Sequence, residues 1–147
     1  MNTTLINCNK RRISTMHCPL FFTPTQLDDM SDKLIGRVSY VNDVLMRAVR
    51  SNANNPLRAC SLNDILNIVV FLDEVIVMFD SAVQAVDGHD DWSRDRFAID
   101  LREIERLYVK RTGDASVSTF ASVVGDSVFN MFRRVFPTFV HRIGALL

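Results

Sequence analysis

One stretch of the chain decides the fold: residues 61–86 run SLNDILNIVVFLDEVIVMFDSAVQAV. Its apolar residues keep to no single side of a helix, and a helix that is apolar all round is typically buried. The β-branched residues would also suit a strand, but an uninterrupted strand of more than about 15 residues would be unusual. Ser61 and Asp64 have the spacing of a helix-capping box. We therefore predict a buried central apolar helix over 61–86.

The segment before this helix is amphipathic. Thr23 can cap a helix, Pro24 suits its first turn, and Gln26 stands at the capping-box position. Apolar residues then recur by threes and fours, which is the period of one helix face. The pattern predicts a helix over 24–50.

Two further amphipathic segments follow the central helix. The apolar periodicity predicts helices over 91–112 and 114–136, separated by Gly113, which suits the left-handed position at a helix end. Pro137 must kink or end the last of them because it lacks a backbone N–H. A short terminal helical piece completes the predicted set.

Composition sets the class and the domain organisation. The chain has 147 residues, of which 48% are apolar and 23% charged, and 17 basic residues balance 17 acidic ones. This is ordinary globular composition, which excludes a disordered chain. Only five Gly and four Pro argue against a turn-dense β fold. We predict an all-α protein, a compact bundle of four to six helices over 23–147, preceded by a basic flexible tail over 1–22.

Motifs for catalysis or cofactor binding are absent from the sequence. It contains no Gly-rich phosphate loop, no Gly-x-Ser-x-Gly elbow and no His-Glu-x-x-His pair. Cys8, Cys18 and Cys60 are odd in number and irregular in spacing, which indicates reduced cysteines and a cytoplasmic location. His17 beside Cys18 lacks the further ligands that zinc needs. We expect no enzyme activity, no catalytic residue, no cofactor and no metal.

Two acidic residues, Asp73 and Glu74, interrupt the apolar run of 61–86. They leave no stretch long enough for a membrane span. Asp80 lies two turns past Asp73 on roughly the same side, with Asp87 beyond it. That side is either the one wet stripe of the helix or the place where arginines of the 91–112 segment would pair with it. A chain without net charge also lacks the basic footprint of a nucleic-acid-binding domain, so we expect neither a membrane span nor a nucleic-acid partner.

Two segments resemble a known family. Residues 90–97, DDWSRDRF, are similar to the death-motif helix of the B-cell-lymphoma (Bcl) family of apoptosis regulators, with an acidic pair, an aromatic residue and an arginine-rich turn. Residues 117–124, VSTFASVV, followed by Val128 and Phe129, are similar to the family segment Phe-Ala-x-Val-Val-x-x-Leu-Phe. The resemblance spans about 45 residues. It implies a short, divergent member, with a viral source left open.

The resemblance implies a function and a site. The protein would regulate apoptosis without enzymatic chemistry, by holding an amphipathic death-motif helix of a protein partner in an apolar groove. The implied groove residues are Phe97, Leu101, Phe120, Val124 and Phe129. An arginine would be the polar anchor; Arg142 is the nearest match, with Arg133 and Arg134 as alternatives.

A second function class stays open. The apolar C-terminal stretch 128–147 would also suit contacts between copies of one chain. The alternative is therefore a self-assembling helical structural protein of the viral coat or scaffold type, a homo-oligomer. Sedimentation at micromolar concentration separates the two classes.

Overall fold

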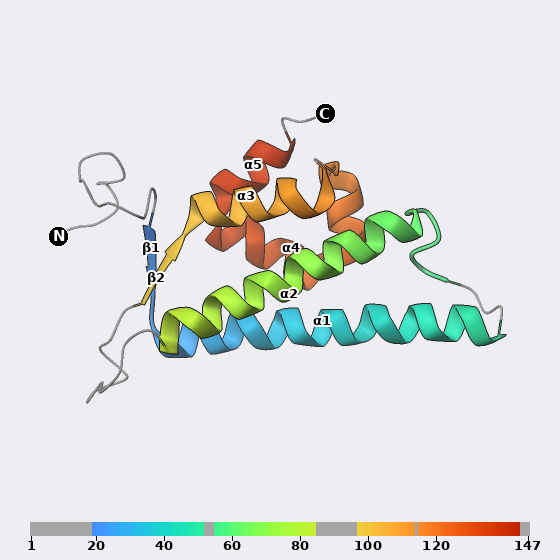
Figure 1. Ribbon diagram of the computed structural model, residues 1–147, viewed down its shortest axis with the longest axis horizontal. Coiled ribbons are helices and arrows are strands. Elements are labelled where there is room, and N and C mark those ends of the chain that lie inside the picture. The colour runs from blue at the N-terminus through green and yellow to red at the C-terminus, as the bar shows by residue number, and fades with distance from the viewer. Residues whose placement is uncertain (1–18, 52–54, 85–96, 114, 145–147) are drawn as a thin grey trace.

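The computed structural model describes residues 19–51, 55–84, 97–113 and 115–144 (Figure 1). Over these residues the chain forms five helices and one two-stranded sheet. Helices α1 (Pro24–Ser51) and α2 (Leu62–Gln84) lie side by side along one side of the molecule, and the later helices pack on the other side of α2. The predicted fold class, an all-α helical bundle, is confirmed.

The first two helices begin where the sequence predicts. At α1, the Thr23 amide donates to Gln26 Oε1 at 2.8 Å and the Gln26 amide donates to Thr23 Oγ1 at 3.1 Å, which is a complete capping box. At α2, the Asp64 amide donates to Ser61 Oγ at 3.1 Å. The predicted bounds 24–50 and 61–86 differ from the observed ones by one residue at the start of α2 and one at the end of α1, and residues 85 and 86 lie outside the described residues.

A small antiparallel sheet replaces part of two predicted segments. Strand β1 (Pro19–Phe22) pairs with β2 (Phe97–Asp100) in the register Pro19 to Asp100. The helix predicted over 91–112 is therefore wrong for residues 97–100, and the bundle begins no later than Pro19, inside the predicted tail over 1–22. The helical spacing led to the wrong prediction because Phe97 fits both the apolar stripe of a helix and the alternating burial of a strand. The remaining predicted residues of that helix, 91–96, and the tail residues 1–18 lie outside the described residues.

The helix that follows β2 begins at a side-chain cap that the sequence analysis did not predict. Helix α3 (Leu101–Thr112) begins after Asp100, whose carboxylate accepts from the Arg102 amide at 3.0 Å. With Glu103 three residues on, Asp100 has the spacing of a capping box. Gly113 ends the helix at φ 62°, in the predicted left-handed conformation.

The C-terminal region forms two helices with a break inside the first. Helix α4 (Val117–Val135) is interrupted at Gly125, whose backbone has φ 79° and ψ 167°. Helix α5 (Pro137–Gly144) starts at Pro137, so the proline ends one helix and opens the next, as predicted.

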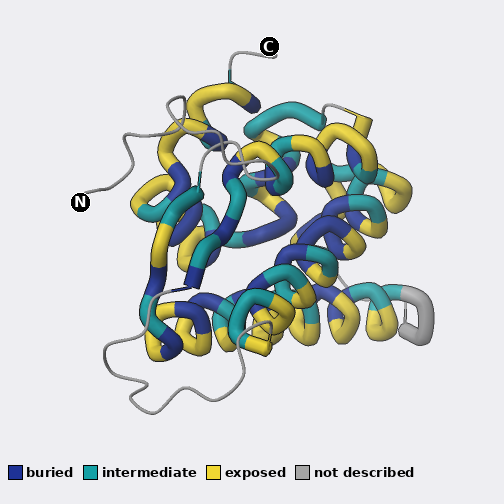
Figure 2. Tube along the Cα trace, turned by 60° about the vertical axis from the view of Figure 1, so that its left-hand side comes forward, coloured by how far each residue is buried: buried dark blue, intermediate teal, exposed yellow. Residues whose placement is uncertain are grey.

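The core lies between the α1–α2 pair and helices α3 to α5 (Figure 2). Its centre is an aromatic cluster in which Phe71 of α2 makes ring contacts with four others at centroid distances of 5.2 to 6.3 Å. These four are Tyr108, Phe120, Phe132 and Phe139, and all are fully buried. Edge-to-face and stacked rings of this kind add to the energy of burial. The cluster ties α2, α3, α4 and α5 together.

Helix α2 is central but not buried all round. It contacts α1, α3, α4 and β2, and seven of its side chains are buried. Four of its apolar side chains nevertheless remain exposed: Leu62, Leu66, Val70 and Val77. The sequence prediction of an enclosed helix is therefore wrong for this one side of α2.

Candidate functional site

The predicted groove residues lie in the core. Four of them are covered, with exposed fractions of 0 to 9%: Phe97, Leu101, Phe120 and Val124. The fifth, Phe129, is partly buried and contacts the ring of Phe120 at 6.2 Å. Because these side chains are buried or partly buried, they line no open groove in this structure.

The predicted arginine anchor lies elsewhere. Arg142 is exposed on α5 and pairs with Glu105 of α3 at 3.3 Å. Of its alternatives, Arg133 lies over the Phe129 ring at 5.7 Å and Arg134 is exposed. Residues 90–96, which carry most of the resemblance to the death motif, lie outside the described residues.

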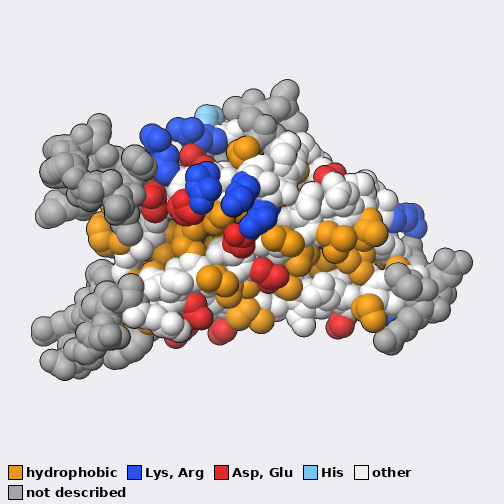
Figure 3. Space-filling view, viewed as in Figure 1, with side chains coloured by type: hydrophobic (Ala, Val, Ile, Leu, Met, Phe, Trp, Pro, Cys, Tyr) orange, Lys and Arg blue, Asp and Glu red, His pale blue; other side chains and the backbone are white. Residues whose placement is uncertain are grey.

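An exposed apolar surface occurs instead on α1 and α2, and we call it the hairpin face. It consists of Ile35 and Met46 of α1 together with Leu62, Leu66, Val70 and Val77 of α2, each 42 to 61% exposed. Figure 3 shows hydrophobic side chains gathered in a band over α2 and between α2 and α1. These six are most of the exposed large apolar side chains that the described residues contain.

Helix geometry explains why these residues share one surface. On α2 the exposed positions 62, 66, 70, 73, 77 and 80 recur by threes and fours, so they form one stripe, in which Asp73 and Asp80 are the charges. On α1, Ile35 and Met46 are eleven residues apart, which is close to three full turns. The periodic spacing of these residues can be read from the sequence. An apolar helix with one exposed stripe, however, has the same apolar sequence pattern as a helix that is buried all round.

Basic side chains border the hairpin face along α3. Arg111 of α3 donates two hydrogen bonds to Glu74 of α2. That contact, together with the nearby charges of Lys110 and Arg106, lowers the pKa of the Glu74 carboxyl. These contacts turn this side of α3 toward α2, and Figure 3 shows Lys and Arg side chains gathered above the apolar band. An arginine of the predicted 91–112 segment thus pairs with Glu74, whereas Asp73 and Asp80, on the side for which such pairing was an alternative, are exposed.

Acidic side chains border the opposite edge, along α1. Asp28 precedes Ile35 by seven residues, two turns of helix, and so lies on the same side of α1. Asp28 and Asp32 are both exposed. The face thus has an edge on α3 where Arg106, Lys110 and Arg111 outnumber Glu103 and Glu74, the partners of Arg106 and Arg111, and an acidic edge on α1. We call these the basic and the acidic edge. Within it, burial raises the pKa of the Asp73 carboxyl above its ordinary value of 3.8.

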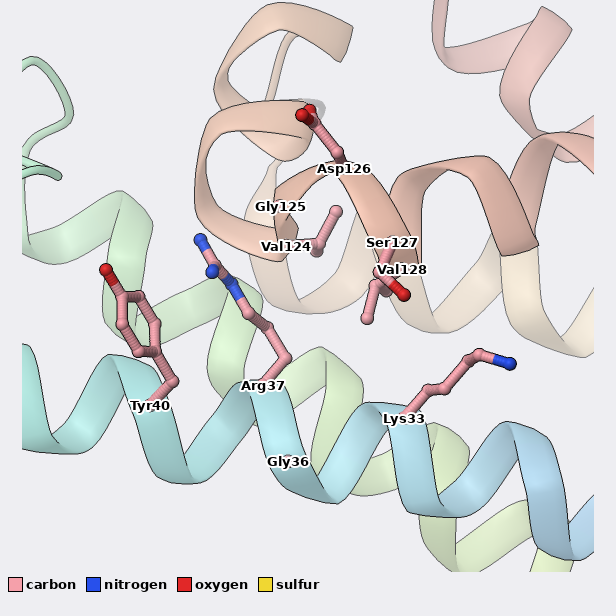
Figure 4. A pocket seen from close by; sticks show the side chains of 9 residues that line it. All are labelled: Lys33, Gly36, Arg37, Tyr40, Val124, Gly125, Asp126, Ser127 and Val128. Atoms are coloured by element: carbon pink, nitrogen blue, oxygen red, sulfur yellow. The ribbon is translucent and has the colours of Figure 1, made fainter.

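A separate hollow of about 260 Å³ lies between α1 and the break in α4 (Figure 4). Arg37 of α1 extends into the break, where its Nε donates to Val123 O at 2.7 Å and a terminal nitrogen donates to Ser122 O at 3.3 Å. Because Gly125 interrupts the helix, these carbonyls lie at a helix end. The guanidinium also lies 4.6 Å from the Tyr40 ring. Arg37 acts here as a clamp between two helices.

Other classes of site find no support among the described residues. No group of three or more His, Cys, Asp or Glu side chains in this part of the chain is placed to hold a metal ion. No helix in the described ranges is long and apolar enough to cross a membrane. Cys60, on the segment before α2, is a free thiol. Comparison of the chain with protein-family models, curated proteins and solved structures gave no match.

Proposed function

We propose that this protein is a non-enzymatic interaction module that binds a helical protein partner through the hairpin face. The observation that supports the proposal is the stripe of half-exposed Leu and Val along α2, continued by Ile35 and Met46 on α1. Apolar side chains spaced by threes and fours are what an amphipathic helix packs against. A contiguous apolar surface with charged edges is typical of a protein contact site.

The apolar side chains give the face a useful amount of binding energy. Complete burial of an exposed Leu, Ile, Met or Val stabilises by about 1.5–3 kcal/mol. The six side chains are about half exposed, so covering them contributes roughly 5–9 kcal/mol before the costs of association. Association removes at least about 4 kcal/mol. The charged edges must therefore contribute for the partner to bind tightly.

The experiment is a selection of amphipathic helices from a displayed library, with the folded protein as bait. The Leu66→Lys, Val70→Lys double variant is the counter-bait, and we expect helices that bind the wild-type protein below about 10 µM and lose at least tenfold on the variant. Both changed residues are exposed, so circular dichroism and the unfolding midpoint should stay near those of the wild type.

A matched control comes from α3. Val109 is 51% exposed, as much as the residues of the face. Val109 lies one turn after Glu105, and Glu105 faces α5 because it pairs with Arg142. Val109 also lies about 200° round the helix from Arg111, which faces α2. Val109→Lys should leave binding unchanged. If no helix binds although the chain is monomeric, or if binding is equally sensitive to Val109→Lys, the proposal is wrong.

The finer proposal is an apoptosis regulator of the Bcl type, acting in the cytoplasm, with a viral source still open. It is supported by the resemblance of residues 90–97 and 117–129, and it places the partner helix against Phe97, Leu101, Phe120, Val124 and Phe129 with Arg142 as anchor. These core residues would have to separate to admit a helix, which costs the ring contacts between them. Titration with death-motif peptides tests it: no binding at tens of micromolar contradicts the finer proposal and leaves the hairpin face untouched.

A further inference from the structure

The hairpin face has the form of half a four-helix bundle. Two antiparallel helices, α1 and α2, pack against each other (Figure 1), and hydrophobic side chains of both gather on one outer side (Figure 3). In a four-helix bundle such a pair packs against a second pair. We infer that the second pair is α1 and α2 of another copy of this chain, related by a two-fold axis, an inference that rests on the proposed interaction function.

The size of the face fits a second copy better than a single helix. Helix α2 has 23 residues, so it is about 35 Å long. Two helices packed about 10 Å apart present a surface about 20 Å wide, which gives about 700 Å². A stable protein interface covers about 800 Å² on each partner. One partner helix, about 10 Å across, leaves half of this surface in water, whereas a second pair of helices covers it.

The two charged edges decide how the copies are oriented. A two-fold axis that runs along the helices places α1 of the partner over α2, and so brings the acidic edge of the partner beside the basic edge on α3. An axis across the helices sets acidic against acidic and basic against basic. Opposite charges at an interface fix its register and like charges oppose association. The axis along the helices is therefore the one that the charges favour.

The same axis gives favourable helix directions. A rotation about an axis parallel to the helices leaves their directions unchanged, so each α1 lies against a partner α2 that runs the opposite way. All four neighbouring pairs in the bundle are then antiparallel, which is the up-down arrangement common among four-helix bundles. The contact is isologous, since the same residues of each copy form it.

The first experiment is sedimentation equilibrium of the full chain from 1 to 100 µM. A reducing agent keeps its three cysteines from cross-linking copies. We expect a monomer–dimer equilibrium with Kd in the low micromolar range, a loss of at least tenfold for the Leu66→Lys, Val70→Lys variant, and no loss for Val109→Lys. A monomer throughout this range overturns the inference, as does a dimer that both variants leave intact.

The helix-library selection keeps the two proposals distinguishable. If the chain is monomeric and helices still bind the face, the second copy is excluded and the interaction function stands. If the chain is monomeric and no helix binds, both proposals fail.

Charge reversal tests the direction of the axis. Asp28→Lys with Asp32→Lys makes the edge on α1 basic, and Arg106→Glu with Lys110→Glu makes the edge on α3 acidic. Each pair of changes alone should weaken the dimer at least fivefold, and the four together should restore Kd to within about threefold. In each double variant, the dependence of Kd on salt concentration should fall together with the affinity, because salt screens the charges at the edges. If neither double variant weakens the dimer, each edge faces the same edge of the partner, and the axis runs across the helices instead.

Discussion

The break in α4 offers the sharpest test of the tertiary structure. Gly125 has φ 79° and ψ 167°, a region that is essentially restricted to glycine. A Cβ added there would lie 2.7 Å from Cζ of Arg37 and 2.9 Å from Nη1. Gly125→Ala must therefore strain the backbone and displace the guanidinium that clamps α1 to α4.

The structure sets the size of the effect. The unfavourable backbone conformation costs about 1–3 kcal/mol. Displacing Arg37 removes its hydrogen bonds to Val123 O and Ser122 O, and a hydrogen bond from a charged group contributes about 1.5–3 kcal/mol, less where water reaches it. We expect Gly125→Ala to lower the free energy of unfolding by about 3 kcal/mol. Small proteins are stable by about 5–15 kcal/mol, so the loss is readily measured.

Urea unfolding followed by far-ultraviolet circular dichroism measures this change, with every variant at one protein concentration because association adds to apparent stability. Gly36→Ala is the matched control, since Gly36 lies inside α1 with nothing within 4 Å of the added Cβ. It should stabilise by about 0.5–1 kcal/mol.

A double-mutant cycle with Arg37→Met separates the two causes. Without the guanidinium, Gly125→Ala should cost only its backbone strain, so the two changes should couple by about 1–2 kcal/mol. If Gly125→Ala lowers the free energy of unfolding by less than about 0.5 kcal/mol, the break in α4 does not require glycine. Strict additivity with Arg37→Met refutes the clamp.

Three further predictions address the core and the hairpin face. Phe71→Ala should destabilise by about 3–5 kcal/mol, because the fully buried ring leaves a cavity at the centre of the aromatic cluster; calorimetry should show a lower Tm, and a Tm within a few degrees of wild type would contradict the central place of Phe71. Tyr108→Phe should cost about 1 kcal/mol in urea unfolding, since its hydroxyl donates to Ala115 O at 2.6 Å; no loss would show that water replaces the bond freely. Asp73→Asn should stabilise the protein at pH 7: because the folded-state pKa is raised, the wild type loses stability as pH rises from about 3.8 through that pKa. The difference between the two proteins should shrink as pH falls to 3.8, and an advantage of Asn that persists there would exclude the carboxylate as its cause.

Local sequence determined the helices and most of their ends. Thr23 with Gln26, Ser61, Gly113 and Pro137 act within one turn of their own positions, and interactions this short are encoded by spacing alone. The helical class followed from them. Strand β2 escaped prediction because Phe97–Asp100 is extended only through its pairing with β1, which lies about 80 residues earlier in the chain.

The partition of apolar residues between core and surface was decided only by the tertiary structure. Periodicity predicted that Phe120 and Val124 lie on an apolar side of their helix, but only the structure shows that both are buried in the core, where Phe120 contacts Tyr108 of α3 and Phe139 of α5. Helix α2 looked uniformly apolar in sequence, yet its neighbours α1, α3 and α4 surround it on all sides but one. Helical spacing fixes the direction in which each side chain points, whereas the number and position of neighbouring helices fix whether anything covers it. The uncovered side, Leu62, Leu66, Val70 and Val77, became visible only when those neighbours were in place.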